Sequence, residues 1–213
     1  MIPRIIRFDN ARFLAVVIVG VCTIVSAAGW SLNTHFAQGR QIKQRVIDKA
    51  FTRSSPVVEI TEVKVSQKAI ELGKIFDEDD DWLNKSFLKV KNVSTKPIVY
   101  LAININFPET RATGSMMSYP IVFGQMPRSK FPQRKDAIFM MPGDLLEVPL
   151  DKHYLKIKSF VEQRTRIANI GKVDLEIGFV VFADKTAWMA GEYLRQDPND
   201  PDHYINVGDR PSQ

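Results

Sequence analysis

The stretch SFLKVKNVSTKPIVYLAININF, residues 86–107, decides the fold. Two extended runs flank the segment NVSTKP, whose Asn, Ser and Pro residues are typical of a turn. In the second run apolar side chains alternate with Asn104 and Asn106, which is the two-residue period of a strand that buries one face. The buried face predicted by this alternation comprises Val99, Leu101, Ile103, Ile105 and Phe107.

Three further segments carry strand signals. VVEITEVKVS (57–66) alternates with a period of two, and AIFMMPGDLLEVPL (137–150) is predicted as strand, Pro142–Gly143 turn and strand. YPIVFG (119–124) predicts one short strand inside a long connection rich in Pro, Gly and Ser, residues 108–136. Loops of this length inside a compact domain are usually functional or mobile.

The segment KVDLEIGFVVFADKTAWMAGEYL (172–194) predicts a hairpin with its turn at Asp184–Lys185 and AWMAGEYL as the returning strand. Its first strand places Val173, Leu175, Ile177, Phe179 and Val181 on one face. We expect Phe179 and Val181 to be buried between two sheets. On that expectation Phe179→Ala should cost about 3–5 kcal/mol of stability.

A helical insert, HYLKIKSFVEQRTRIA (153–168), precedes this hairpin. Seven or eight short strands without alternating helices are typical of two packed antiparallel sheets. The sequence therefore predicts a mostly β protein: an antiparallel immunoglobulin-like β-sandwich over 57–196 with one helical insert, followed by a C-terminal tail at 197–213.

The N-terminus predicts a hydrophobic helix. Three arginines precede FLAVVIVGVCTIVSAAG (13–29), which is 17 uncharged and mostly apolar residues. This length lies at the short end of a membrane span and just above a signal-peptide core. Residues 1–30 are thus either a signal-anchor, through which 13–29 contacts the membrane, or a signal peptide cleaved near SAA. The first alternative predicts an inner-membrane protein with its C-terminal domain outside the cytoplasm, and the second predicts export to the periplasm.

Residues 31–56 are predicted to form a juxtamembrane helix and linker. QIKQRVIDKAF (41–51) places Ile42, Val46, Ile47, Ala50 and Phe51 at helical spacing. Two interpretations are open: a basic helix lying on an anionic membrane surface, or a stalk that joins the anchor to the domain. The short length favours the stalk.

The charge distribution argues against nucleic-acid binding. The whole chain has a formal net charge of +5. Residues 1–56 hold eight basic and two acidic residues, a net charge of +6, which leaves the remainder at −1. A nucleic-acid binder should carry its positive charge on the folded module. Cys22 is the one cysteine, so the exported part has no disulfide and no thiolate metal site.

Three polar segments are candidate sites. In DKTAWMAGEYLRQDPNDPD (184–202) the candidate calcium ligands are Asp197, Asn199, Asp200 and Asp202. The spacing lacks a turn glycine and a closing bidentate Glu, which favours an exit turn without metal. The run DEDDDW (77–82) is either a cation site or a solvated loop. RSKFPQRK (128–135) is either a contact for lipid head groups or an acidic partner, or a solvated loop tip.

The strand segments support a resemblance at the level of pattern over residues 57–194. FLKVKNVSTKPIVYLAINI resembles the B–C strand pair of immunoglobulin-like and fibronectin-like sandwiches in bacterial envelope proteins, and MMPGDLLEVPL is similar to the strand that commonly follows. FADKTAWMAGEY is similar to a hairpin of uncharacterised exported bacterial proteins, with Lys185 in place of the turn glycine. This class shares no activity, so the resemblance implies no catalytic residue.

These observations favour a non-catalytic cell-envelope protein without a cofactor, a protein-interaction or structural module with an envelope protein as partner. None of the motifs G-x-S-x-G, H-E-x-x-H or a glycine-rich phosphate loop occurs in the sequence. One alternative is a calcium- or carbohydrate-binding module, which exposure of Trp82 or Trp188 beside the acidic loops would favour. A second alternative is a hydrolase with a carboxylate-based site.

Overall fold

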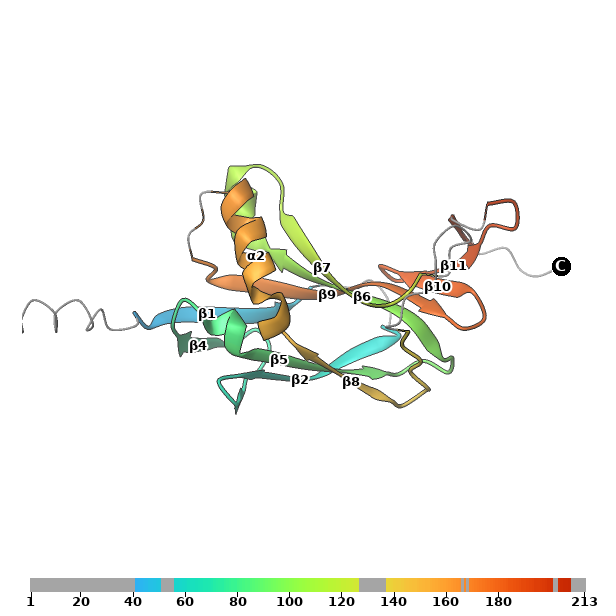
Figure 1. The fold of residues 1–213 in the computed structure, drawn as a ribbon, viewed down its shortest axis with the longest axis horizontal. Helices are drawn as coiled ribbons and strands as arrows, with labels where there is room; N and C mark the ends of the chain where they lie inside the picture. The colour runs from blue at the N-terminus through green and yellow to red at the C-terminus, as the bar shows by residue number, and fades with distance from the viewer. Residues whose placement is uncertain are drawn as a thin grey trace, which may run out of the picture. The chain divides into compact units, whose positions relative to one another are not determined.

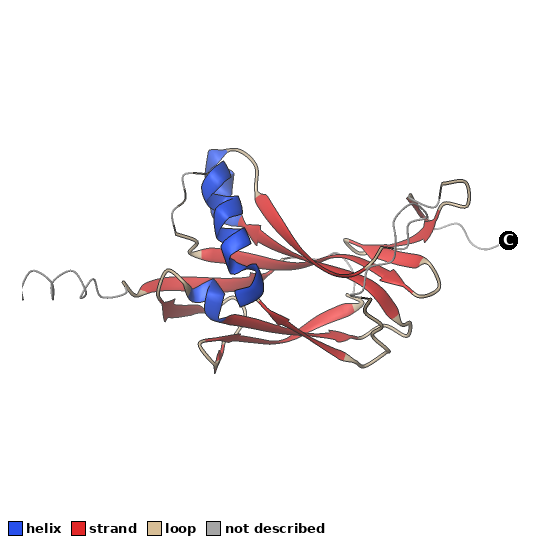
Figure 2. Cartoon of the chain, viewed as in Figure 1, coloured by secondary structure: helices blue, strands red, loops and turns tan. Residues whose placement is uncertain are grey.

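The computed structural model describes residues 41–50, 56–126, 137–165, 167, 169–200 and 203–207. Within these residues the protein is mostly β, with two sheets and one α-helix (Figures 1 and 2). The eight-stranded sheet contains β1 (Lys43–Lys49), β4 (Ile75–Glu78), β6 (Ile98–Phe107), β7 (Met117–Gly124), β9 (Lys172–Phe182), β10 (Thr186–Met189), β11 (Glu192–Gln196) and β12 (Tyr204–Asn206). The four-stranded sheet contains β2 (Val58–Val65), β3 (Lys68–Ala69), β5 (Ser86–Asn92) and β8 (Leu145–Pro149).

Strand β9 organises the larger sheet. Most of β9, from Asp174 to Phe182, pairs antiparallel with β6 along one edge. On the other edge its first residues pair parallel with β1, and residues near its end pair antiparallel with β10. The larger sheet is therefore mixed, which corrects the prediction of purely antiparallel sheets.

The core lies between the two sheets and is closed by the helix. Among the largest fully buried side chains are Trp82, Trp188, Phe107 and Phe182. The predicted helical insert is confirmed as α2 (Asp151–Arg164), which buries Tyr154, Ile157 and Val161 at helical spacing. Figure 1 shows α2 rising from the end of β8 toward β7, and it contacts β7 and the short 3-10 helix η1 (Trp82–Lys85). A second 3-10 helix, η2 (Pro108–Thr113), joins β6 to β7.

A β-bulge changes the buried face of β9. Ile177 pairs with Ile103, but Phe179 pairs with Ala102, so Gly178 is an extra residue on its strand. A Cβ at Gly178 would lie 2.4 Å from Nδ2 of Asn104, which explains why glycine occupies the bulge. Because one inserted residue inverts the alternation, residues before and after the bulge face opposite sides.

The predicted single face of β9 is therefore wrong beyond Ile177. Val180 and Phe182 enter the main core in place of Phe179 and Val181. Val181 is buried in a smaller cluster with Ala187 and Leu194, against which the half-buried Phe179 packs. Similar irregularities occur in β2 near Thr61 and in β6 at Val99, which also leaves the main core.

The bulge changes the expected cost of two Phe substitutions. We expect Phe182→Ala, at a site that is 1% exposed, to lower the free energy of unfolding by about 3–5 kcal/mol. Phe179→Ala should cost only about 1–2 kcal/mol, since a half-buried ring loses less area. Urea denaturation of both variants measures the difference. Equal costs would contradict the face inversion.

The predicted helix over 41–51 is also wrong, because residues 43–49 form the strand β1. β1 lies between β9 and β4, and its buried positions are Arg45 and Ile47, two residues apart. The apolar spacing that fits a helix also fits a strand when a cation occupies one inward position. Residues 51–55 of the predicted linker and the segment 13–29 lie outside the described residues.

The C-terminal hairpin keeps its predicted turn and gains another. Asp184–Lys185 joins β9 to β10, with Lys185 at a positive φ of 66°. The predicted returning strand is in fact two strands, β10 and β11, joined at Ala190–Gly191, where both φ angles are positive. The segment predicted as an exit tail also returns, because β12 pairs with β11.

Candidate functional site

The acidic run 77–82 leads from β4 into η1 and contacts a buried arginine. Arg45 of β1 is 2% exposed, and its guanidinium forms a salt bridge with Asp80. The same guanidinium donates hydrogen bonds to the carbonyl oxygens of Ile170 at 3.0 Å and Glu78 at 3.4 Å. Burial opposes ionisation, but hydrogen bonds from Lys43 and Arg45 hold the pKa of Asp80 below its ordinary value.

Three other carboxylates of the run, those of Glu78, Asp79 and Asp81, also have partners within the protein. Lys85 donates hydrogen bonds to Asp79 at 2.7 Å and to Glu78 at 3.0 Å. The bond to Asp79 is the main cause of the raised pKa of Lys85. Tyr154 of α2 donates its hydroxyl hydrogen to Asp81. Burial and this bond raise the pKa of Tyr154. The run therefore connects β1, β4, η1 and α2, which is more than the predicted solvated loop would do.

The two tryptophans that would have favoured a carbohydrate site are fully buried. Trp82 donates its indole N–H to the Ile170 carbonyl at 2.7 Å and packs edge-to-face against Phe76. Trp188 lies in the main core, as the hairpin interpretation predicted. Neither ring offers an exposed platform for a sugar.

Three of the candidate calcium ligands, Asp197, Asn199 and Asp200, lie between β11 and β12. Asp197 accepts a hydrogen bond from the backbone N–H of Asn199 at 2.8 Å, which is the local capping expected for an Asx turn. Asp200 contacts the His203 ring, and Asp202 lies outside the described residues. In the described part of the chain no group of three or more His, Cys, Asp or Glu side chains converges as a metal site would require.

Acid should destabilise the protein through its hydrogen-bonded carboxylates. Partial burial of Asp184 opposes ionisation, but bonds from Lys96 and Thr186 lower its pKa to about 2, from 3.8. A carboxyl whose pKa is lowered by folding contributes stability above its unfolded value, and loses it as the pH falls through its folded value. We therefore expect the melting temperature to fall between about pH 4 and pH 2. Asp184→Asn should lower it at pH 6 and flatten this acid limb, and an unchanged limb would contradict the assignment.

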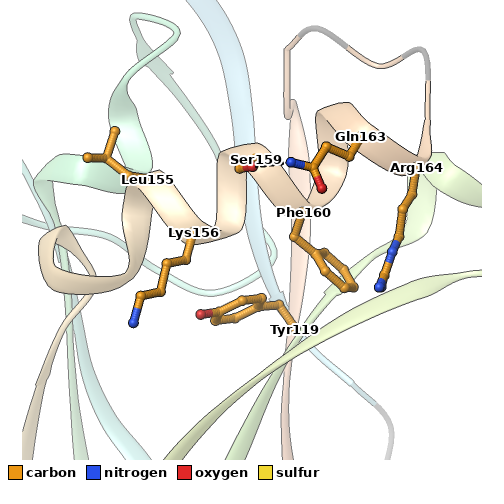
Figure 3. Close-up of a pocket in the computed structure, with 7 residues that line it drawn as sticks. All are labelled: Tyr119, Leu155, Lys156, Ser159, Phe160, Gln163 and Arg164. Carbon is orange, nitrogen blue, oxygen red and sulfur yellow. Dashed lines mark hydrogen bonds between the residues drawn. The ribbon is translucent and has the colours of Figure 1, made fainter.

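An open groove lies between α2 and β7. Tyr119 of β7 and Phe160 of α2 meet edge-to-face, with ring centroids 5.6 Å apart. The Arg164 guanidinium lies over the Phe160 ring at 4.4 Å, within the range of a cation–π contact. Figure 3 shows the Tyr119 ring below α2 between Lys156 and Phe160. The cavity beside these rings has a volume of about 460 Å³.

The groove continues toward the start of β7, where a second hollow of about 420 Å³ shares Phe160 and Arg164. Ser115, Met116, Met117 and Ser118 line this part. Leu155 on the rim is 76% exposed. The charged side chains that line the two hollows are Lys156 and Arg164, with no carboxylate among the lining residues. The groove thus combines aromatic rings, apolar side chains and two cations. Among them, Tyr119 and Arg164 are of the residue types enriched at binding hot spots.

Sequence reasoning missed this groove. One signal was present: Lys156, Phe160 and Arg164 follow one another at intervals of four and so share one face of a helix. Tyr119 is distant in sequence, and the antiparallel pairing of β6 and β7 brings it under α2. All eight residues of the basic segment RSKFPQRK (128–135) lie outside the described residues, so both interpretations of this segment stay predictions.

No protein-family model, curated protein or solved structure matches this chain. The structure confirms only the coarse part of the expected resemblance, a mostly β protein with two sheets. Among the helices that the structure describes, none is long and apolar enough to cross a membrane.

Proposed function

We propose that this chain is a non-catalytic protein of the cell envelope that binds another protein through the groove between α2 and β7. The groove is the observation that carries the proposal. It is open to solvent, and it presents Phe160 with Arg164 stacked on the ring. Aromatic and arginine side chains on a preformed concave surface are typical of binding sites between proteins.

The contrast with the other polar clusters supports this choice. Carboxylates of the acidic run are engaged by Arg45, Lys85 and Tyr154, and they join elements of the fold. Lys156 and Arg164 in the groove lie on exposed positions of α2 at the surface. A cation that faces solvent beside an aromatic ring is available to a partner, whereas a cation held by carboxylates stabilises the protein itself.

The location in the envelope is part of the same proposal and rests on the sequence. The apolar run 13–29 follows three arginines and precedes the described domain. Both alternatives, anchor and cleaved signal, place the domain outside the cytoplasm. A finer fold assignment, an immunoglobulin-like sandwich of exported bacterial proteins, is supported by β5 and β6, which are consecutive strands in different sheets.

In-cell photo-crosslinking tests the binding function. A photoreactive phenylalanine analogue replaces Gln163, which lines the groove, and in a control variant it replaces Lys68 on the exposed strand β3. We expect a discrete adduct with another protein from position 163 and none from position 68. Identical patterns from both positions would refute a groove-specific partner.

Protease treatment of spheroplasts tests the location. Residues after 56 should be digested while a cytoplasmic marker stays intact. Protection of both would place the domain in the cytoplasm and refute the envelope proposal.

A further inference from the structure

Strand β7 forms an edge of the larger sheet beside the groove. Within the described residues β7 pairs with β6 alone, over Met117 to Gly124. An edge strand presents backbone N–H and C=O groups that can pair with an added strand. Pro120 and Val122 are exposed, and Val122 is 41% exposed.

Pro120 indicates which backbone groups of β7 point outward. A proline has no N–H, so it is tolerated where the strand would not donate to its neighbour. Pro120 is opposite Asn104, and this pair is therefore expected to be one that exchanges no hydrogen bonds. By the two-residue period, Ser118 and Val122 then point their N–H and C=O groups away from β6. The N–H groups of Ser118 and Val122, and the C=O groups of Ser118, Pro120 and Val122, are then available to pair with an added strand.

The charge of the groove selects the kind of segment that would add there. Lys156 and Arg164 are unopposed by any lining carboxylate. The longer segments of this chain outside the described residues are themselves basic, since 1–40 and 127–136 each have a net charge of +3. A second copy bound symmetrically at the same surface would bring Lys156 and Arg164 of both copies together. Charge therefore disfavours both of these occupants.

From this edge and this charge we propose that the groove takes an extended acidic segment of another protein, which adds as a strand to β7. The inference rests on the proposed binding function and specifies its partner. The segment's backbone pairs with Ser118 and Val122. Side chains on its inward face alternate between apolar groups, which contact Tyr119 and Phe160, and carboxylates, which pair with Lys156 and Arg164. Strand addition supplies affinity through the backbone and specificity through alternate side chains.

A defined peptide tests both parts of the inference. The probe is a fluorescein-labelled ten-residue peptide with Thr at the even positions and Glu, Ile, Glu, Phe and Glu in turn at the odd positions, so that one face of the extended strand presents both carboxylates and apolar groups. Its binding to the full chain in non-ionic detergent is followed by fluorescence anisotropy. We expect saturable binding that weakens by about tenfold or more in Arg164→Glu, because the substitution replaces a cation with a carboxylate that repels the acidic peptide. Lys68→Glu on β3, outside the groove, should bind as the natural protein does. Equal loss in both variants would overturn the groove assignment.

Two further peptides separate charge from strand pairing. A version with Lys in place of Glu should bind about tenfold more weakly or not at all. A version with alternate backbone amides N-methylated should also lose about tenfold, since the methyl groups remove the donors for β7. Equal binding of the Lys peptide overturns the acidic preference, and equal binding of the N-methylated peptide overturns strand addition. Val122→Pro removes a backbone donor from the same edge of β7 and should weaken binding of the Glu peptide. If that variant does not fold, the N-methylated peptide alone tests strand addition.

An anionic lipid is the competing occupant. Glycerophosphoglycerol, a soluble lipid head group, should leave the labelled peptide bound at millimolar concentration, and displacement would overturn the peptide assignment in favour of phosphate. A groove adduct in cells without peptide binding would leave the proposed function intact and refute only this partner chemistry. Loss of both would refute the proposed function as well.

Discussion

The Asp80→Ala variant is expected to lose about 2–4 kcal/mol of its free energy of unfolding, because it leaves the Arg45 charge buried without its carboxylate. Arg45 is 2% exposed, whereas the Asp80 side chain is 41% exposed. Solvent access to Asp80 moderates the loss, and the carbonyl oxygens of Ile170 and Glu78 continue to accept hydrogen bonds from the guanidinium. Chemical denaturation monitored by tryptophan fluorescence measures the change.

Two companion variants assign that loss to the buried charge. Asp77→Ala changes an exposed carboxylate in the same run and should alter stability by less than about 0.5 kcal/mol. Adding Arg45→Met to Asp80→Ala removes the uncompensated charge and should recover part of the loss. If the double variant is less stable than Asp80→Ala by the full cost of Arg45→Met, the two side chains are not coupled.

Gly124→Ala should cost about 3 kcal/mol or more, because two unfavourable effects add at the end of β7. Gly124 has a φ of +73°, which side chains rarely adopt. An added Cβ would also lie 2.2 Å from the carbonyl oxygen of Val99 and 2.8 Å from Cγ1 of Ile138. The carbonyl belongs to Val99, between Ile98 and Tyr100, and Tyr100 pairs with both β7 and β9, so the backbone has little room to move.

Gly143→Ala is the matched control for the backbone effect. Gly143 has a φ of +90°, but a Cβ there would meet nothing within 4 Å. This variant should therefore show the conformational cost alone, about 1–2 kcal/mol. Thermal melts of the two variants side by side measure the contribution of the contact. Equal losses would mean that the strand end shifts to accommodate the methyl group.

The sequence predicted the strand and helix content because alternation and turn residues are local signals. β5, β6, β9 and α2 all lie where these signals place them. It could not predict the bulge at Gly178, since one inserted residue leaves the alternation on each side intact and changes only the relation between the two sides. Phe179 and Phe182 exchange environments for that reason.

Long-range pairing explains the other errors. Arg45 occupies an inward position of β1, which becomes favourable only when the Ile170 carbonyl and Asp80 are brought to it. No local pattern shows that partnership, so the apolar spacing of 41–51 suggested a helix. The groove was missed for a similar reason, because Tyr119 meets Phe160 only through the packing of α2 on β7.

The parallel pairing of β1 with β9 sets the order of events while the chain is being made. Arg45 and Ile170 are 125 residues apart, so β1 emerges about 6–25 s before its partner at synthesis rates of about 5–20 residues per second. β1 can pair early with β4, but its other edge then waits for β9. During that interval the nascent domain exposes an open strand edge to other chains. We therefore expect chains interrupted before Lys172 to depend on chaperones, since they lack the strand that covers the second edge of β1.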